Sequence, residues 1–143
     1  GYAAQLYSLK SEQNWGLGDF GDLQQLVKST AKQGASAIGL NPLHPLYQNN
    51  PAHCSPYSPM SRCFLNTQYI NVTSVPNFDS CKLAQKRVNS KAFKVNLENA
   101  RNSELVDYVA VAELKYPVLE MLHNDFIKNG EASDLKEFID YKT

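Results

Sequence analysis

The segment "DFGDLQQLVKSTAKQGASAIGL", residues 19–40, decides the fold, because it reads as one helix that leads into a short apolar strand. Asp19 occupies the N-cap position, and Asp22 stands where a capping box carries its acidic side chain. Apolar side chains then recur at helical spacing, and Gly34 follows where a left-handed residue commonly ends a helix. "SAIGL", residues 36–40, predicts a short buried strand.

A second apolar segment precedes this helix. "AAQLYSL", residues 3–9, predicts a strand with at least one buried face. Strand, helix and strand in this order form a βαβ unit, so we expect parallel strands joined by a right-handed crossover. Ligands of parallel α/β proteins collect at the carboxyl ends of the strands. The candidate site is therefore formed by the loops "KSEQNWGLGD", residues 10–19, and "NPLHPLYQNNPAHCSPYSPMSR", residues 41–62.

The second of these loops is unusually long for a connection without regular structure. Loops beyond about 12–15 residues are usually functional or disordered, and the prolines and aromatic residues here disfavour disorder. At its centre "SPYSP", residues 55–59, places Tyr57 between Pro56 and Pro59, whose rings fix φ and stiffen the backbone. We expect a stiff loop that presents a tyrosine ring.

After the long loop the pattern changes from β to helical. "FLNTQYINV", residues 64–72, is rich in β-formers and predicts a strand. "SCKLAQKRV", residues 80–88, predicts a short amphipathic helix, whose basic face of Lys82, Lys86 and Arg87 we expect to be solvated.

Two further helices complete the chain. A long helix is predicted over residues 107–128, capped by Asp107, kinked at Pro117 and ended by Gly130. The last helix starts at about Ser133 and meets no stop signal before the sequence ends. The stripe expected to pack into the core consists of Leu114, Val118 and Leu122.

Composition and charge restrict the function. The chain has 143 residues, with 14 basic and 14 acidic side chains, which fits one domain of ordinary size. This neutral balance argues against nucleic acid and acidic membrane surfaces as main partners. No apolar run approaches the roughly 18 residues of a membrane-spanning helix, and we expect no signal peptide because the sequence shows no basic-then-apolar start. We expect a cytoplasmic protein.

Cysteine and histidine spacings match no zinc or redox pattern, so no metal site is expected. We expect reduced thiols, and "NVT" at Asn71 would be glycosylated only in a secreted chain. The residues concerned are Cys54, Cys63, Cys81, His44, His53 and His123.

Four segments, taken in order, resemble one enzyme family. They are "QLYSLKSEQNWGLGDFGDL" at 5–23, "GLNPLHPLYQNNP" at 39–51, "SPYSPMSRCFLNTQYINV" at 55–72 and "LVDYVAVAELKYPVLEML" at 105–122. Together they resemble the bacterial amylomaltases, also called 4-α-glucanotransferases, and the resemblance is weakest over residues 76–102. It implies a (β/α)8 barrel with insertions, much longer than this chain. Residues 1–75 would start the barrel with its substrate-site loops, and residues 76–143 would be a helical insertion subdomain truncated at its C-terminus.

The resemblance also implies a reaction and a site. The family transfers α-1,4-glucan segments between maltooligosaccharides by a retaining double displacement, without cofactor or metal. Carried over, Ser55 and Tyr57 would bind the sugar next to the cleaved bond. The family's catalytic carboxylates come from later barrel strands whose motifs are absent here, so we expect no catalytic residue and no activity in the isolated chain. The remainder of its own polypeptide would be its partner.

Each functional interpretation has a structural rival. Asp19 and Asp22 resemble a catalytic pair, but helix capping explains both. For Trp15, packing that closes the barrel top is favoured over sugar contact. Asn41 and His44 follow the second strand and are expected to support the site from behind.

Two other functions stay open. The chain could be a stand-alone module that binds maltooligosaccharides without reacting, or an interaction domain whose exposed sheet edges and helix faces mate with another polypeptide.

Overall fold

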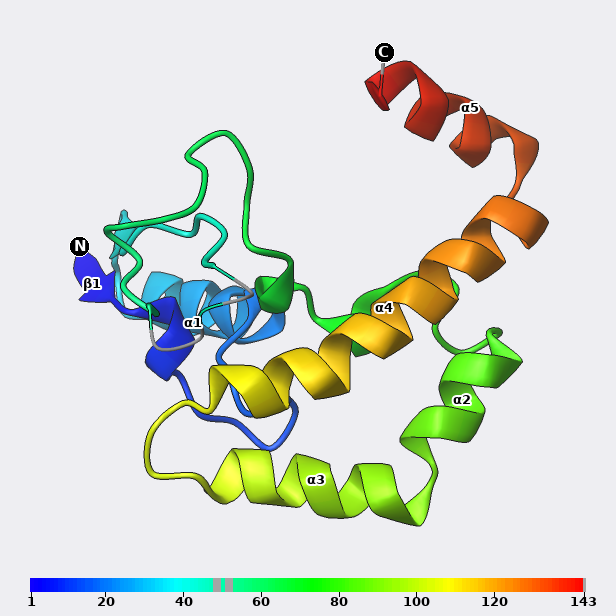
Figure 1. Cartoon of the computed structure of the whole chain (residues 1–143). Coiled ribbons are helices and arrows are strands. Elements are labelled where there is room, and N and C mark those ends of the chain that lie inside the picture. Colours follow the sequence, from blue (N-terminus) through cyan, green and yellow to red (C-terminus); the bar gives the residue numbers. More distant parts are fainter. Residues whose placement is uncertain (48–49, 51–52, 143) are drawn as a thin grey trace.

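The computed structural model describes residues 1–47, 50 and 53–142, and this part of the chain is a mixed α/β structure. Its two strands and five α-helices are β1 (Tyr2–Ala4), α1 (Phe20–Lys32), β2 (Ile38–Leu40), α2 (Lys82–Val88), α3 (Lys91–Asn102), α4 (Tyr108–Asn129) and α5 (Ala132–Lys142). Figure 1 shows the strands and α1 at one end, α2 and α3 beside α4, and α5 beyond the far end of α4. Among the described residues, none of the helices is long and apolar enough to cross a membrane.

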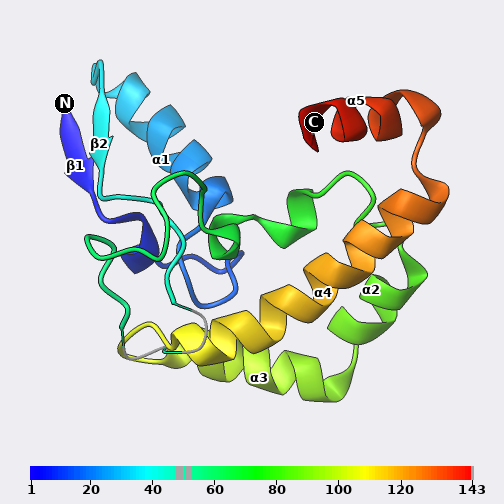
Figure 2. The same cartoon turned by 45° about the horizontal axis from the view of Figure 1, so that its top comes forward.

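The βαβ unit is present, and the parallel pairing of its strands is confirmed. Tyr2, Ala3 and Ala4 pair in parallel with Ile38, Gly39 and Leu40. The expectation that these strands are buried is wrong, since all six residues are exposed or only partly buried. Parallel sheets are normally covered on both faces, whereas in the described part of the chain α1 is the helix that lies alongside the pair (Figure 2).

The first strand is shorter than predicted. It ends at Ala4, and a 3₁₀ turn over Leu6–Ser8 follows. The reason lies in a side chain: the backbone N–H of Leu6 donates to Oδ1 of Asn41 at 3.0 Å instead of continuing a strand ladder. Leu6 itself is fully buried, so the expected apolar contact survives in a different backbone form.

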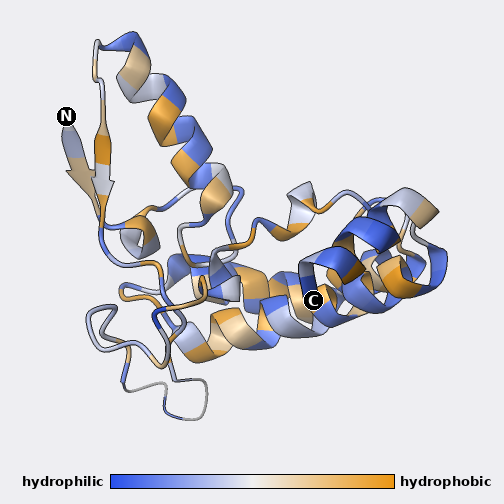
Figure 3. Ribbon diagram, turned by 90° about the horizontal axis from the view of Figure 1, so that it is seen from above, coloured by the Kyte–Doolittle hydropathy of each residue, from blue (hydrophilic) through white to orange (hydrophobic). Residues whose placement is uncertain are grey.

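Helix α1 begins and ends as its sequence predicts. Oδ1 of Asp19 accepts the N–H groups of Gly21 and Asp22, and the Asp22 carboxylate accepts the N–H of Asp19, which completes a capping box. Gly34 has φ of +83°, the left-handed conformation expected after the helix. Apolar and polar residues alternate along α1, as in an amphipathic helix (Figure 3).

The predicted strand over residues 64–72 is wrong. The chain forms two 3₁₀ turns instead, Thr67–Tyr69 and Val72–Ser74. Oδ1 of Asn66 accepts the N–H of Gln68 at 3.0 Å and initiates the first turn. Such local side-chain bonds offer the backbone an alternative to a strand ladder.

The helical half follows the prediction more closely. The short helix predicted over residues 80–88 is present as α2, and Oδ1 of Asp107 caps α4 through the N–H of Ala110. Helix α4 continues through Pro117 and ends directly before Gly130, and the kink at Pro117 stays a prediction. Helix α3 starts at a Ser90 cap within the region expected to be helical but not delimited from sequence.

The apolar side chains form two core clusters. One surrounds Trp15 and contains the predicted stripe of Leu114, Val118 and Leu122, each at most 3% exposed. The other joins Leu6 and Leu17 to Tyr69 and Val111, and so links the start of the chain to α4. Both clusters therefore contain side chains of the loop after β1, residues 10–19, here called the first loop, and of the helices over residues 82–142, here called the helical half.

Candidate functional site

The long loop between β2 and the 3₁₀ turn Thr67–Tyr69, residues 41–66, is closed by contacts between its two limbs. These are Asn66 N to Leu43 O at 2.8 Å, His44 Nδ1 with Phe64 O at 3.3 Å, and Met60 N to Pro45 O at 2.9 Å. The loop therefore has a hydrogen-bonded stem, which starts at the carboxyl end of β2 and carries residues 53–59. Residues 48, 49, 51 and 52 lie outside the described part.

The predicted sugar-binding residues lie on this loop. Ser58 N donates to Ser55 O at 3.1 Å, which closes a turn around Pro56 and Tyr57. The side chain of Tyr57 is 67% exposed, and Ser55 is also exposed. Ser55 and Pro56 line a hollow of about 460 Å³ together with residues of the first loop and of the segment before α4.

Asn41 and His44, expected to support the site, both brace backbone. Asn41 is buried and accepts the Leu6 N–H, which ties the ends of the two strands together. His44 contacts the Phe64 carbonyl across the loop stem. Their contacts fix the backbone from which the long loop leaves.

Trp15 packs, as the sequence predicts. It is 5% exposed, and its ring meets the ring of Phe93 edge to face with centroids 5.0 Å apart. Its partner is α3 of the helical half. The neighbouring Asn14 is also buried, and its carbonyl accepts a hydrogen bond of 2.7 Å from Nε of Arg101. The first loop is therefore a docking element for α3.

Lys115 is a residue of this region that the sequence interpretation missed. It lies on α4 with no exposed surface, and its Nζ is 3.4 Å from Oδ2 of Asp19, 2.6 Å from the Gln68 carbonyl and 2.9 Å from the Ile70 carbonyl. Its position four residues after Val111, on the buried face of the helix, was the available signal.

Burial dominates the electrostatics of this ion pair. Desolvation lowers the pKa of Lys115 and raises the pKa of Asp19, and the attraction between the two charges opposes both shifts. Asp19 is thus engaged twice, by the helix cap and by Lys115. This confirms the capping interpretation and leaves its carboxylate closed to solvent.

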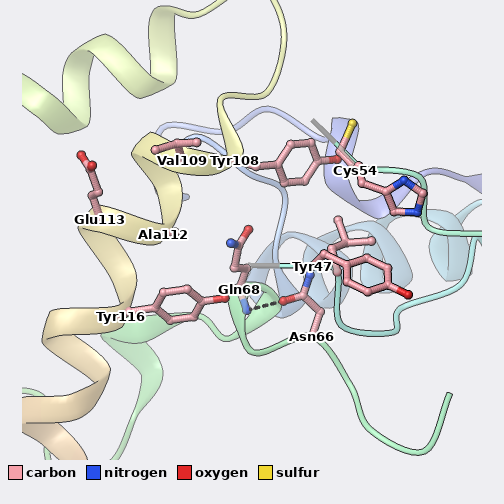
Figure 4. A pocket seen from close by; sticks show the side chains of 11 residues that line it. Tyr47, Cys54, Asn66, Gln68, Tyr108, Val109, Ala112, Glu113 and Tyr116 are labelled. Atoms are coloured by element: carbon pink, nitrogen blue, oxygen red, sulfur yellow. Dashed lines mark hydrogen bonds between the residues drawn. The ribbon is translucent and has the colours of Figure 1, made fainter. Parts of the chain in front are cut away.

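A second cavity of about 300 Å³ lies between the long loop and the first turns of α4 (Figure 4). Tyr116 projects from α4 towards Gln68, whereas Tyr108 projects towards Cys54 of the long loop. Oε1 of Gln68 is buried without a hydrogen-bond partner, and burial raises the pKa of Tyr108. The lining thus offers phenol groups, amide groups and the imidazole of His53, all of which can hydrogen-bond to a polyhydroxylated ligand.

The remaining candidates do not form a site. Within the described residues no His, Cys, Asp and Glu side chains gather into a metal-binding group. The three cysteines are free thiols, exposed at Cys54 and Cys63 and buried at Cys81. Of the basic face expected on α2, Lys82 and Lys86 are exposed and Arg87 is partly buried.

Comparison with known proteins identifies the family. Residues 4–143 match the family model described as 4-alpha-glucanotransferase. The chain is 42% identical over 135 residues to the 4-alpha-glucanotransferase of Haemophilus influenzae, covering 94% of this chain and 19% of that protein. It is 33% identical over 131 residues to that of Mycobacterium tuberculosis, covering 86% of this chain and 18% of the relative.

A solved structure agrees. The crystal structure of amylomaltase from Corynebacterium glutamicum matches with a TM-score of 0.74 and 33% identity, over 85% of this chain and 17% of that one. The chain thus spans about a fifth of the length of the proteins that it matches. Since the family model covers nearly every residue, the chain belongs to the 4-alpha-glucanotransferase family.

Proposed function

We propose that this chain is the opening part of the catalytic (β/α)8 barrel of a 4-α-glucanotransferase, followed by a helical insertion. Residues 1–75 form the start of the barrel, and residues 76–143 form the insertion. The parallel β1–α1–β2 unit supports this proposal, because a (β/α)8 barrel repeats such a unit. The open faces of the strand pair are where further barrel strands and helices would pack.

The whole protein would transfer α-1,4-glucan segments between maltooligosaccharides with retention of configuration. A retaining mechanism needs a nucleophilic carboxylate and an acid/base carboxylate about 5–5.5 Å apart. Asp19 and Asp22, the acidic pair at the start of α1, together form its capping box. Asp19 also forms an ion pair with Lys115. Their engagement supports placing both catalytic carboxylates beyond residue 143.

This chain would supply the contacts to the donor sugar, through Ser55 and Tyr57. The observation that carries the assignment is the 67% exposure of the Tyr57 ring on a loop with a hydrogen-bonded stem. Its face can pack against the C–H face of a pyranose ring, while the Ser55 hydroxyl bonds a sugar oxygen. A loop held before the sugar arrives loses less entropy on binding.

Maltotriose disproportionation tests this function. The complete enzyme that carries this sequence is expected to convert maltotriose into glucose and longer maltooligosaccharides. The 143-residue chain alone is expected to be inactive. Turnover by this chain would show that the catalytic carboxylates lie within residues 1–143 and not beyond them. Titration of the inactive chain with maltotriose, followed by calorimetry, separates this proposal from a stand-alone binding module, because only the module would bind strongly without the rest of the barrel.

A further inference from the structure

We propose that Lys115 is a positioning residue for the loop that carries Ser55 and Tyr57. The proposal rests on the function suggested above for that loop. Lys115 lies on α4, far along the chain from the loop, and touches neither of the two residues that would contact sugar. It would act through the backbone at the base of the loop.

The three contacts of Lys115 use its full hydrogen-bonding capacity. An ammonium group has three N–H donors and no acceptor. Three oxygens surround Nζ, namely Oδ2 of Asp19 and the carbonyls of Gln68 and Ile70. They belong to two separate segments, the cap of α1 and the 3₁₀ turn that follows the long loop. One side chain therefore holds both segments against α4.

From these carbonyls a short path leads into the loop stem. The turn whose carbonyls bind Lys115 begins at Asn66, whose Oδ1 accepts the N–H of Gln68 at 3.0 Å. The backbone N–H of Asn66 donates to the Leu43 carbonyl at 2.8 Å, which is the contact that closes the stem. Two hydrogen bonds, from Gln68 N to Asn66 Oδ1 and from Asn66 N to the Leu43 carbonyl, therefore connect the segment that Lys115 binds to the loop stem.

The ion pair with Asp19 connects Lys115 to the start of α1. Asp19 caps α1 and is therefore set by the βαβ unit, while Lys115 belongs to the helical half. Without the ammonium group, Asp19 would be a buried carboxylate without its counter-charge and two carbonyls would lose a donor. An apolar side chain at residue 115 could fill the volume but could not link the loop base to the α1 cap.

Hydrogen–deuterium exchange of the complete enzyme tests the positioning without reference to activity. Lys115→Met is compared with Leu122→Ala, a change of a buried side chain on the same helix in the core cluster around Trp15. The exchange of each variant is measured at the same number of degrees below its own melting temperature. We expect Lys115→Met to speed exchange over residues 60–70 by about tenfold relative to Leu122→Ala, because the loop base opens locally. Equal exchange in the two variants would overturn the proposal.

Kinetics on maltotriose provide the second readout. Lys115→Met is expected to lower kcat/KM by about tenfold or more at its matched temperature, because a small displacement of a binding group is costly, while Leu122→Ala stays within about threefold of the parent enzyme. An enzyme that shows no turnover before mutation refutes the proposed function, and the exchange result still decides the role of Lys115.

A double variant covers the case in which Lys115→Met does not fold. Asp19→Asn with Lys115→Met keeps a good N-cap residue and leaves no unpaired buried charge, yet still lacks the bonds to Gln68 and Ile70. It is expected to fold and to show the same faster exchange at the loop base. Failure of both variants to fold would assign Lys115 to overall stability and would overturn the positioning role.

Discussion

The rings of Trp15 and Phe93 meet edge to face, with an interplanar angle of 74°, and join the first loop to α3. Both side chains are at most 5% exposed. Edge-to-face aromatic pairs add about 0.5–1.5 kcal/mol to the free energy gained from burial. This contact makes the loop after β1 part of the core, although its position at the end of a strand suggested a binding role.

We therefore expect Trp15→Ala to lower the free energy of unfolding by about 3–5 kcal/mol, because a large buried ring is replaced by a cavity. Urea unfolding followed by circular dichroism measures the loss. Phe64→Ala is the control, since that ring is 68% exposed, and it is expected to change stability by less than about 0.5 kcal/mol. Similar losses in both variants would contradict the packing role of Trp15.

Gly16 and Gly34 offer a matched test of how closely the first loop approaches α3. Both have positive φ, of +91° and +83°. A Cβ at Gly16 would lie 2.9 Å from Cβ of Ala100, whereas a Cβ at Gly34 would meet nothing within 4 Å. We expect Gly34→Ala to cost about 1–2 kcal/mol from backbone strain alone, and Gly16→Ala to cost about 1–3 kcal/mol more because of the clash. Thermal unfolding of the two variants shows the difference, and equal melting temperatures would argue against the close approach.

Tyr69 predicts a loss of stability at high pH. Burial raises the pKa of its phenol from 10.0 to about 12, and the hydrogen bond from Asn41 offsets only part of this effect. A raised pKa means that the folded state holds the proton more tightly, so this stability is fully present below pH 10 and is lost as the pH rises through 12. Two pKa units correspond to about 2–3 kcal/mol.

The free energy of unfolding of the parent chain, measured by urea titration from pH 9 to 12, should therefore fall more steeply than that of Tyr69→Phe. Tyr141→Phe, which changes a ring that is 84% exposed, serves as the control and should follow the parent chain. Identical pH profiles for the parent and Tyr69→Phe would show that burial does not retain this proton.

Tyr57 predicts a loss of activity without a loss of stability. In the complete enzyme, Tyr57→Ala is expected to lower kcat/KM for maltotriose by about 10- to 100-fold, which corresponds to about 1.4–2.7 kcal/mol of transition-state binding. Tyr57→Phe should keep most of the activity if the ring face makes the contact. Phe64→Ala removes another exposed ring of the same loop and should have little effect. Unchanged kinetics in Tyr57→Ala would remove this residue from the donor site.

Features with local causes could be predicted from the sequence. The capping box of Asp19 and Asp22 lies within four consecutive residues, and the left-handed Gly34 follows from the end of the apolar pattern. The parallel pairing of β1 with β2 follows from the helix between them. The exposure of Tyr57 fits its position between prolines, while its sugar-binding role came from family resemblance and stays a prediction.

Features with distant causes could not be predicted. Residues 64–72 carry β-formers, but Lys115, on a later helix, binds two of their carbonyls and the Asn66 side chain bonds the backbone locally. The helix stripe identified Leu114 and Val118 as core positions but gave no reason to place a charge between them. Only the positions of Asp19 and the two carbonyls explain why a lysine is tolerated there.

The contacts of Lys115 also have an order in time. Gln68 precedes Lys115 by 47 residues and Asp19 precedes it by 96, so every oxygen that it binds leaves the ribosome earlier. At a synthesis rate of about 5–20 residues per second, the carbonyl of Gln68 waits roughly 2–9 s for its donor. During that interval the carbonyl at the base of the long loop lacks the Lys115 donor that it has in the complete fold. The contacts between Lys115 and the loop base can therefore form only after α4 has been synthesised.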